Sequence, residues 1–371
     1  MEHIPITVIG GGVIGLASAL ALTKQYGSGK VCLLEKNVKL GMEQSSRSSE
    51  VIHSGIYNTG LKRELAIEGN GMWHRFCQQY NIPLLETGKL IIATNSSEEN
   101  NLDYIIQHKE GIPNVQELSQ QQVLKLEPHI NATSGIFCPT TAVIDTAKAL
   151  DVLEKLCERY GTLIAVKNKV ISINPSSDKI EIYSEVNGIV SSFTTDYLVN
   201  SAGLYSDTIA KMVNPHSNYE IIPVKGEYIQ FHNKQNTPIS RNVYPVPWEF
   251  EHEGRKFYDL GIHLTPSSNG TMIRVGPDVY PITSKEDYKK IKQINTFLEP
   301  ILKLYSHIKK GDLQFDHVGV LAEEKNNYDF IMESDQNYPH CYNLIGMESP
   351  GLTAALAIAN KVVKHSKNYC N

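Results

Sequence analysis

Ile6-Thr7-Val8-Ile9-Gly10-Gly11-Gly12-Val13-Ile14-Gly15 is the strongest indication of the fold in this chain. An apolar strand runs into the pattern Gly10-x-Gly12-x-x-Gly15, and a helical run over residues 16–25 follows it. A second apolar strand, Val31-Cys32-Leu33-Leu34, then ends at the acid Glu35. Strand, glycine turn, helix, strand and acid in this order are typical of a dinucleotide-binding βαβ unit. A glycine-rich turn without a ligand is the alternative, but it does not account for the second strand and its acid.

The residue types at this turn each have a physical reason to bind a dinucleotide. Gly12 has no side chain to hold a pyrophosphate away from the backbone, and Gly15 lets the helix pack closely on the strand. The start of the helix presents unpaired N–H groups and a positive dipole end to phosphates. Glu35 can accept hydrogen bonds from ribose hydroxyls. The predicted dinucleotide site here comprises Gly10, Gly12, Val13, Ile14, Gly15, Glu35 and Lys36.

Composition limits the class of protein. The 371 residues suffice for two domains, and 41% hydrophobic with 20% charged residues is an ordinary globular balance. A net charge of −5 without a long basic run argues against nucleic acid as a partner. No apolar run approaches the roughly 20 residues of a membrane span, and the first strand leaves no room for a targeting peptide. We therefore expect a cytoplasmic protein, with peripheral membrane contact still open.

The six cysteines are scattered and form no CxxC pair, and no other metal-ligand spacing occurs. The sequence therefore predicts neither a disulfide framework nor a metal site.

Hydrophobic periodicity and turn residues predict the remaining elements. Helices are expected over residues 61–80, 98–109, 120–126, 147–160, 285–308 and 351–363. Strands are expected over residues 89–94, 163–166, 169–173, 179–185, 197–201 and 342–345, with an antiparallel sheet within residues 219–275.

The strands near residues 200 and 345 belong beside the first strand of a dinucleotide fold, which makes that domain discontinuous. The prediction is an α/β chain, α+β overall. A Rossmann-like dinucleotide-binding domain is expected over residues 1–85, 140–215 and 320–371. A smaller antiparallel-sheet substrate domain is expected over residues 86–139 and 216–319.

A resemblance to known enzymes implies that this domain is a Rossmann-like FAD-binding domain. The run Ser45-Ser46-Arg47-Ser48-Ser49-Glu50-Val51-Ile52-His53-Ser54-Gly55-Ile56-Tyr57 resembles the motif after the first βαβ unit in FAD enzymes of the D-amino-acid oxidase/glycerol-3-phosphate dehydrogenase superfamily. Within it, the chain is most similar to L-2-hydroxyglutarate dehydrogenases and oxidases. Further segments similar to family motifs follow in order, at residues 60–62, 68–69, 200–207, 223–228, 261–266, 275–277 and 346–353.

This resemblance implies an FAD cofactor and a set of residues that bind it. Hydroxyls of the serine-rich run suit the FAD phosphates, and the free N–H groups at residues 351–353 suit negative charge at the flavin N1/O2 edge. The cofactor-binding residues that it implies are Ser46, Arg47, Ser48, Val170, Ala202, Gly203, Gly319, Gly346, Gly351, Leu352 and Thr353.

Oxidation of a C–H bond beside oxygen or nitrogen transfers a hydride to flavin N5 and releases a proton from the heteroatom. A neutral imidazole is a natural base for that proton. The family motifs place His53 and His263 near the flavin ring, and these are the predicted catalytic residues. The predicted substrate contacts are Tyr57, Lys225, Tyr228, Arg274 and Leu321.

The chain departs from the family at Leu321, which stands where the family generally has an arginine that grips a substrate carboxylate. A bidentate charged contact contributes roughly 1.5–3 kcal/mol, so its loss weakens carboxylate binding about 10- to 150-fold. Lys225 replaces another family arginine and keeps only the charge. Arg274 could supply a cation from elsewhere.

The expected function is FAD-dependent oxidation of a 2-hydroxy acid or related alcohol similar to L-2-hydroxyglutarate. An amine or amino-acid substrate is one alternative, and a nucleotide-binding scaffold without catalysis is another. Oxygen, a quinone and a carrier protein all stay open as electron acceptors.

Overall fold

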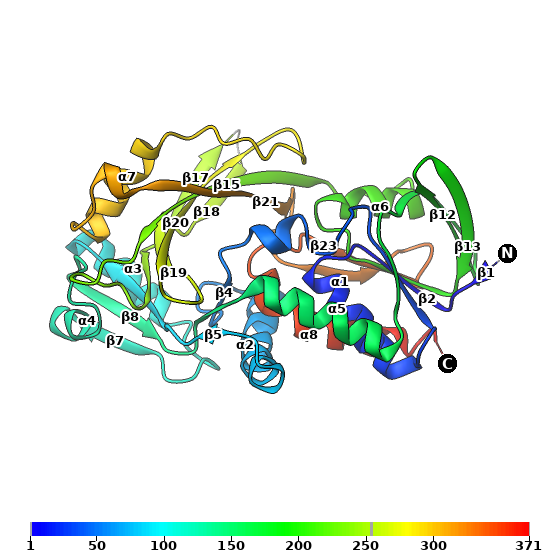
Figure 1. Ribbon diagram of the computed structural model, residues 1–371, viewed down its shortest axis with the longest axis horizontal. Coiled ribbons are helices and arrows are strands. Elements are labelled where there is room, and N and C mark those ends of the chain that lie inside the picture. The colour runs from blue at the N-terminus through cyan, green and yellow to red at the C-terminus, as the bar shows by residue number, and fades with distance from the viewer. Residues whose placement is uncertain (1, 253–254, 371) are drawn as a thin grey trace.

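The computed structural model describes residues 2–252 and 255–370. The molecule is elongated, and each end holds one large sheet (Figure 1). Both termini lie at the same end, next to strand β2. The sheet at that end has six strands, in the order β10 (Leu163–Ala165), β3 (Val31–Leu34), β2 (Ile6–Ile9), β14 (Tyr197–Asn200), β23 (Cys341–Ile345) and β22 (Ile331–Ser334).

The first five of these strands are parallel, and only β22 is antiparallel to its neighbour. The four central strands are buried along their whole length. A continuous apolar run is what a parallel strand needs when both of its faces are covered. The sheet therefore has the dinucleotide-binding topology that the glycine turn predicts, with β14 and β23 beside β2 although they are distant in sequence.

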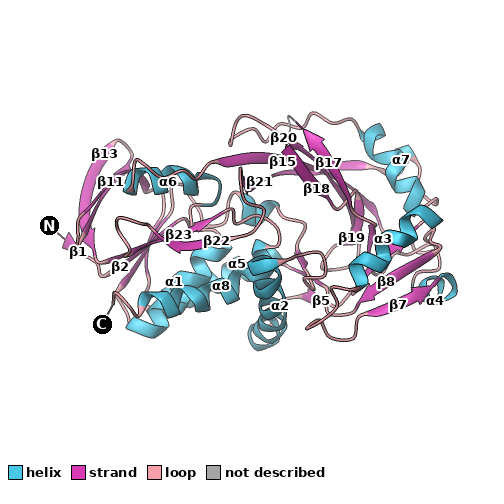
Figure 2. Cartoon of the chain, turned by 180° about the vertical axis from the view of Figure 1, so that it is seen from behind, coloured by secondary structure: helices cyan, strands magenta, loops and turns pink. Residues whose placement is uncertain are grey.

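Helices cover one face of this sheet, as Figure 2 shows from behind. They are α1 (Val13–Tyr26), α2 (Gly60–Tyr80), α5 (Thr146–Tyr160) and α8 (Gly351–Ser366). The other face carries α6 (Ser206–Val213) and a four-stranded sheet in the order β1 (Glu2–His3), β13 (Ile189–Thr195), β12 (Ile180–Val186) and β11 (Lys169–Pro175).

Helix α5 illustrates how local sequence sets an element. The Asp145 side chain accepts a hydrogen bond from the backbone N–H of Lys148 at 2.8 Å, and Gly161 ends the helix with φ +86°. These are the usual start and stop signals of a helix, and the prediction over residues 147–160 is confirmed.

The second large sheet has eight strands. Their order is β21 (Gln314–Glu324), β15 (Ile221–His232), β20 (Met272–Pro281), β19 (His263–Pro266), β16 (Asn242–Pro245), β6 (Lys89–Ala93), β8 (Ser134–Cys138) and β7 (Gln116–Ser119). All neighbours are antiparallel except β16 and β6. The helices α3 (Ser96–Ile106), α4 (Gln120–Leu126) and α7 (Ile294–Leu304) pack on this sheet.

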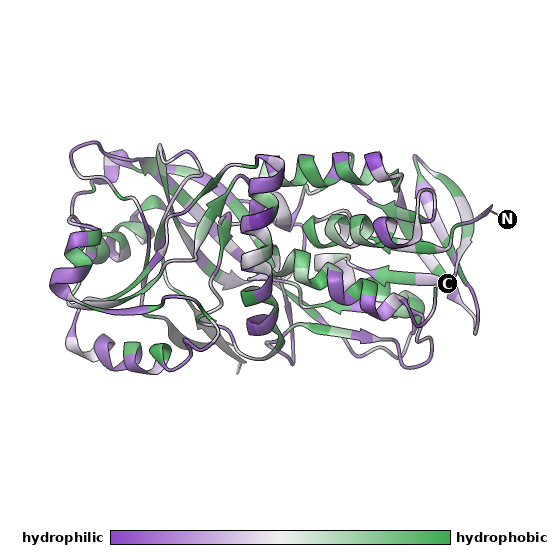
Figure 3. Ribbon diagram, turned by 90° about the horizontal axis from the view of Figure 1, so that it is seen from below, coloured by the Kyte–Doolittle hydropathy of each residue, from purple (hydrophilic) through white to green (hydrophobic). Residues whose placement is uncertain are grey.

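Two small sheets and three 3₁₀ turns complete the described elements. The small sheets are β4 (Val51–Ile52), β9 (Ala142–Ile144) and β5 (Leu84–Leu85), and the pair β17 (Trp248–His252) and β18 (Arg255–Asp259). The turns are η1 (Gln44–Arg47), η2 (Gly203–Tyr205) and η3 (Lys310–Asp312). Helices and strands carry the hydrophobic segments, and the outer loops are mostly hydrophilic (Figure 3).

The prediction of secondary structure fails in two ways. The helix expected over residues 285–308 is helical only in α7, because the Glu227 carboxylate accepts the backbone N–H groups of Ile291 and Lys292 and keeps that segment out of the helix. Several strands are absent from the prediction, among them β7, β8, β13, β21 and β22. In β13 the residues that open the strand, Ile189 and Val190, are exposed and give no clear alternation. The predicted fold class is confirmed, whereas the domain limits stay a prediction, and β21 runs across the expected limit at residue 320.

Candidate active site

A cavity of about 990 Å³ lies between the two large sheets and is lined by residues of both. The dinucleotide turn, η1 and the start of α8 line it from one side. Strands β15, β19 and β21 line it from the other. Its volume is at the upper end for small-molecule and cofactor sites.

The three glycines of the opening turn have two different roles. A Cβ atom on Gly10 would lie 2.4 Å from the Ser201 carbonyl oxygen, and one on Gly15 would lie 1.8 Å from the Gly10 carbonyl oxygen. Both positions therefore serve close backbone packing. A Cβ on Gly12 would meet only the Ser45 hydroxyl, at 3.1 Å, so the space over this backbone is open to the cavity. Gly12, Val13 and Ile14 line the cavity.

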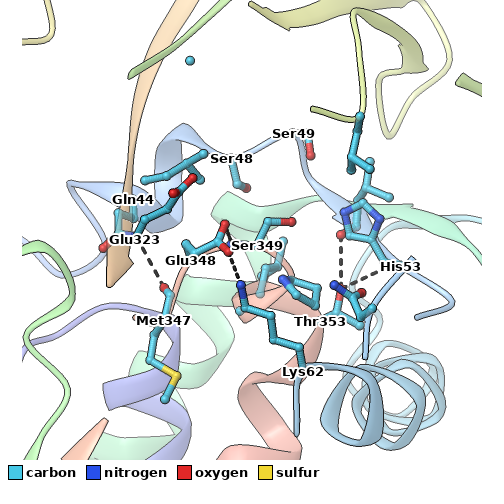
Figure 4. Close-up of a pocket in the computed structure, with 18 of the residues that line it drawn as sticks. Gln44, Ser48, Ser49, His53, Lys62, Glu323, Met347, Glu348, Ser349 and Thr353 are labelled. Atoms are coloured by element: carbon cyan, nitrogen blue, oxygen red, sulfur yellow. Dashed lines mark hydrogen bonds and ion pairs between the residues drawn. The ribbon is translucent and has the colours of Figure 1, made fainter. Parts of the chain in front are cut away.

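The serine-rich run binds the turn through a residue that the sequence reasoning missed. The hydroxyl of Ser45 accepts the backbone N–H of Val13 at 2.9 Å and lines the cavity, as do Arg47, Ser48 and Ser49. Ser46 does not line it, and its hydroxyl is 3.4 Å from the Glu43 carbonyl oxygen. Because η1 turns successive side chains to different sides, a motif match alone does not tell which serine faces inward. Ser48 lies at the cavity wall in Figure 4.

Glu35, Lys36 and Val170 lie together but outside this cavity. The carboxylate of Glu35 accepts the backbone N–H groups of Gly11 and Asn37, both at 2.8 Å. Its carbonyl accepts the N–H of Asn168, two residues before the buried Val170. The acid thus fixes the glycine turn, and the expectation that these three residues also touch a cofactor stays a prediction.

Some of the remaining predicted cofactor-binding residues line the cavity and others do not. Gly203, Gly319, Gly351, Leu352 and Thr353 line the cavity, whereas Ala202 and Gly346 do not. Gly319 has a packing reason as well, because a Cβ there would lie 2.6 Å from the Arg47 carbonyl oxygen.

Both predicted catalytic histidines line the cavity, one from each side. His53 follows β4, and the Thr353 hydroxyl accepts its backbone N–H at 2.9 Å (Figure 4). His263 opens β19, and its Nδ1 lies 2.9 Å from the Gly261 carbonyl oxygen. Burial lowers the pKa of His53 well below the ordinary value, with Lys89 and His263 adding to the effect, and it lowers the pKa of His263 to about 3. Both imidazoles are therefore neutral near pH 7.

Two functional candidates were missed by the sequence reasoning. Lys89 on β6 is fully buried, and its Nζ lies 3.0 Å from Nδ1 of His53. Tyr244 on β16 stacks on the His263 ring, with 3.8 Å between ring centroids. A lysine inside the apolar run Lys89–Ala93 was the available signal, because a strand buried along its length has no ordinary place for an ammonium group.

Of the predicted substrate contacts, Tyr57, Tyr228 and Leu321 line the cavity, whereas Lys225 and Arg274 do not. Val224, Gly226 and Tyr228 share one face of β15, so the side chain of Lys225 points to the other. There its Nζ pairs with Asp287 at 2.7 Å. Arg274 is held behind the cavity wall by Asp316 at 2.7 Å and Glu50 at 3.2 Å.

Acidic groups gather at the end of the cavity near Leu321. Glu323 lines the cavity two residues further along β21, and Glu348 forms an ion pair with Lys62 at the cavity floor (Figure 4). The Asp329 carboxylate accepts the backbone N–H groups of Leu61 and Lys62 at the start of α2. At Leu321, where the family generally has an arginine, this chain thus has no cation and several carboxylates nearby.

Comparisons with known proteins agree with this geometry. The family model described as FAD dependent oxidoreductase, DAO, matches residues 5–364. The chain belongs to the DAO family of FAD-dependent oxidoreductases. It is 28% identical over 405 residues to the L-2-hydroxyglutarate dehydrogenase of Indibacter alkaliphilus, covering 96% of this chain and 97% of that protein. It is 31% identical over 296 residues to the mitochondrial L-2-hydroxyglutarate dehydrogenase of Homo sapiens, covering 76% and 62%.

Solved structures of oxidases share the fold. The FAD-bound L-α-glycerophosphate oxidase of Mycoplasma pneumoniae superposes with a TM-score of 0.87 at 26% identity, covering 99% of this chain and 95% of that one. Glycine oxidase of Geobacillus kaustophilus gives a TM-score of 0.82 at 16% identity, covering 100% and 96%. The predicted family and cofactor are therefore confirmed.

The residues present fit FAD. The open space over Gly12, the starts of α1 and α8, and the serines Ser45 and Ser48 line one cavity. Within residues 2–252 and 255–370, no group of His, Cys, Asp and Glu side chains is arranged to hold a metal ion. No helix in the same ranges has the length and apolar character to span a bilayer. The cytoplasmic location stays a prediction, since relatives include mitochondrial enzymes.

Proposed function

We propose that this protein oxidises the hydroxyl-bearing carbon of a 2-hydroxy acid, or of a related alcohol, similar to L-2-hydroxyglutarate. The observation that carries the proposal is the pair of neutral imidazoles, His53 and His263, facing one cavity from opposite sides. An alcohol releases a proton from oxygen as it loses a hydride from carbon, and a neutral imidazole is suited to take that proton. Similarity to L-2-hydroxyglutarate dehydrogenases supports the same substrate class.

In this proposal the chain's residues hold the substrate and remove its proton, and bound FAD supplies the hydride acceptor. His53 takes the hydroxyl proton, because the amine of Lys89 lies at hydrogen-bond distance from its Nδ1. His263 donates or accepts a hydrogen bond at Nε2, a buried atom without a partner among the described residues. Tyr57 and Tyr228 close the cavity wall around the reacting carbon.

Leu321, which lines the cavity, argues against a 2-hydroxy dicarboxylate as the substrate. A leucine cannot bind a second carboxylate, and the nearby Glu323 repels one. A substrate whose far end is uncharged or is held by other groups fits this region better. The structural likeness to a glycerophosphate oxidase makes a phosphorylated alcohol the second candidate, supported by similarity over nearly the whole chain.

Anaerobic reduction of the FAD-loaded enzyme tests this proposal. The panel contains both enantiomers of 2-hydroxyglutarate, shorter 2-hydroxy acids, L-α-glycerophosphate, glycine and L-proline, and loss of the oxidised-flavin absorbance is followed. We expect one of the alcohols in this panel, a 2-hydroxy acid or L-α-glycerophosphate, to bleach the flavin. The rate of bleaching by that alcohol should fall about 10²- to 10⁴-fold in His53→Gln, with FAD retained. Bleaching by amines alone would reject the proposal in favour of amine oxidation. No bleaching by any compound would favour a scaffold without catalysis.

A further inference from the structure

Lys89 is a fully buried lysine whose only hydrogen-bond partner among the described residues is a catalytic candidate. Its Nζ lies 3.0 Å from Nδ1 of His53. The same nitrogen lies over the aromatic rings of Tyr244 and Tyr57, 4.1 Å and 4.7 Å from their centroids. No carboxylate in the described part of the chain pairs with it, which is unusual for a buried cation.

The titratable groups around Lys89 supply no compensating negative charge near pH 7. Cys138 lies opposite Lys89 on the adjacent strand β8, and burial raises the pKa of its thiol. Burial also keeps the phenol of Tyr244 protonated by raising its pKa, and His263 is neutral. Burial of the amine without a carboxylate lowers the pKa of Lys89 to about 7. Both protonation states of this lysine are therefore accessible near neutral pH.

The protonation state of Lys89 decides which nitrogen of His53 carries the proton. An ammonium group can only donate, so it makes Nδ1 an acceptor and leaves the ring proton on Nε2. A neutral amine accepts from Nδ1–H, which leaves the lone pair of Nε2 free. Nε2 lies across the ring from Lys89, and no described residue bonds it. Only the second arrangement makes His53 a base toward the cavity.

We propose that Lys89 is a positioning residue that holds His53 in the tautomer with Nε2 free and takes up the displaced Nδ1 proton. The proposal rests on the alcohol oxidation proposed above. The substrate O–H bond breaks and an Nε2–H bond forms, while the Nδ1–H bond breaks and a third Nζ–H bond forms. The hydride from the substrate carbon would pass to bound FAD, which would supply the two-electron acceptor. The new ammonium charge lies over the rings of Tyr57 and Tyr244, where cation–π attraction stabilises it.

Two substitutions separate this role from a merely structural one. Lys89→Met keeps the length of the side chain and removes the amine, and Lys89→Arg keeps a permanent donor that cannot accept. The matched control is Lys225→Met, which removes another fully buried lysine from the same sheet but leaves the cavity wall unchanged. Each FAD-loaded variant is mixed anaerobically with the alcohol that reduces the wild type, over a range of pH.

We expect the wild-type rate of flavin reduction to rise with pH through an apparent pKa of about 7, which belongs to the Lys89–His53 pair. The rate falls about 10²-fold in Lys89→Met and Lys89→Arg, the lower end of what a base contributes, and the rise near that pH disappears. Lys225→Met keeps the wild-type rate and pH profile. A Lys89→Met enzyme that keeps the wild-type rise overturns the proposal.

A second readout needs no turnover. In FAD-loaded protein with ¹⁵N-labelled histidine, the His53 signals are assigned by their loss in His53→Gln. We expect the ring proton of the wild type to move from Nε2 to Nδ1 as the pH rises through about 7, and to stay on Nε2 in Lys89→Arg. The same protonated nitrogen at every pH in both proteins overturns the proposal. If no alcohol reduces the flavin, the proposed function fails, and this tautomer measurement alone decides the role of Lys89.

Discussion

The Thr353 hydroxyl accepts the backbone N–H of His53 at 2.9 Å, although the two residues are 300 positions apart in the chain. Thr353 lies in the first turn of α8, and His53 follows the short strand β4. The same hydroxyl lies 3.4 Å from the Val51 carbonyl oxygen. One side chain therefore fixes the catalytic candidate relative to the helix start that faces the cavity, and this relationship leads to the first prediction.

We expect Thr353→Val to lower the free energy of unfolding by about 1–3 kcal/mol, because the buried N–H of His53 loses its acceptor. Flavin reduction should slow as well, since the imidazole is no longer held in register with the cofactor. Thr353→Ser keeps the hydroxyl and is the matched control. Denaturant unfolding and anaerobic reduction measure the two effects. Equal behaviour of the valine and serine variants would show that the hydroxyl does not position His53.

Gly12→Val should abolish FAD binding and leave the fold intact. The branched side chain enters space that the protein leaves open over the backbone of the turn. Gly15→Ala is the contrasting variant, because its methyl group would lie 1.8 Å from the Gly10 carbonyl oxygen and should destabilise the sheet itself. The absorbance of bound flavin and a thermal melt distinguish the two outcomes. Stoichiometric FAD in folded Gly12→Val would contradict the assignment of the turn.

Leu321→Arg should restore binding of dicarboxylates, provided that the new guanidinium is not neutralised. Glu323 lies two residues away on the same face of β21, so the test uses the double variant Leu321→Arg/Glu323→Gln. We expect the dissociation constant of a dicarboxylate inhibitor to fall about 10- to 150-fold relative to Glu323→Gln alone. The pair Leu321→Met/Glu323→Gln controls for the change in side-chain shape. An unchanged or larger constant would reject the alignment at this position.

Lys89 should make stability depend on pH in a defined direction. Its pKa is about 7 in the folded protein, against 10.5 for an unperturbed lysine, so the unfolded chain binds more protons between these values. The cost of burying this lysine is therefore fully present below pH 7 and is relieved as the pH rises toward 10.5. We expect Lys89→Met to be more stable than the wild type at pH 6, with an advantage of a few kcal/mol that shrinks in alkali.

Urea unfolding of Lys89→Met and the wild type across this pH range measures that difference. Lys225→Met is again the control, because its amine pairs with Asp287 and its removal should only destabilise. An advantage of Lys89→Met that grows with pH would contradict the lowered pKa. The expected result also means that the chain retains a destabilising lysine at the catalytic candidate, as is common where function and stability conflict.

The nucleotide-binding half of the fold is predictable from the amino-acid sequence, because that half depends on local patterns. The glycine turn, the apolar strands and the cap at Asp145 are set by neighbours in sequence, and the structure has each of them. Ordered motif matches also led to His53 and His263, which the structure brings to one cavity from positions 210 residues apart. Even the family and its cofactor follow from such matches.

Which side chains face that cavity depends on tertiary contacts that local sequence patterns do not specify. Strand alternation turned Lys225 away, η1 presented Ser45 rather than Ser46, and Glu227 held a segment with helical periodicity extended. The partnership of Lys89 with His53 joins β6 to the end of β4, and no spacing in the sequence marks it. Orientation and burial depend on contacts between distant segments, so a residue's type and local pattern do not fix them.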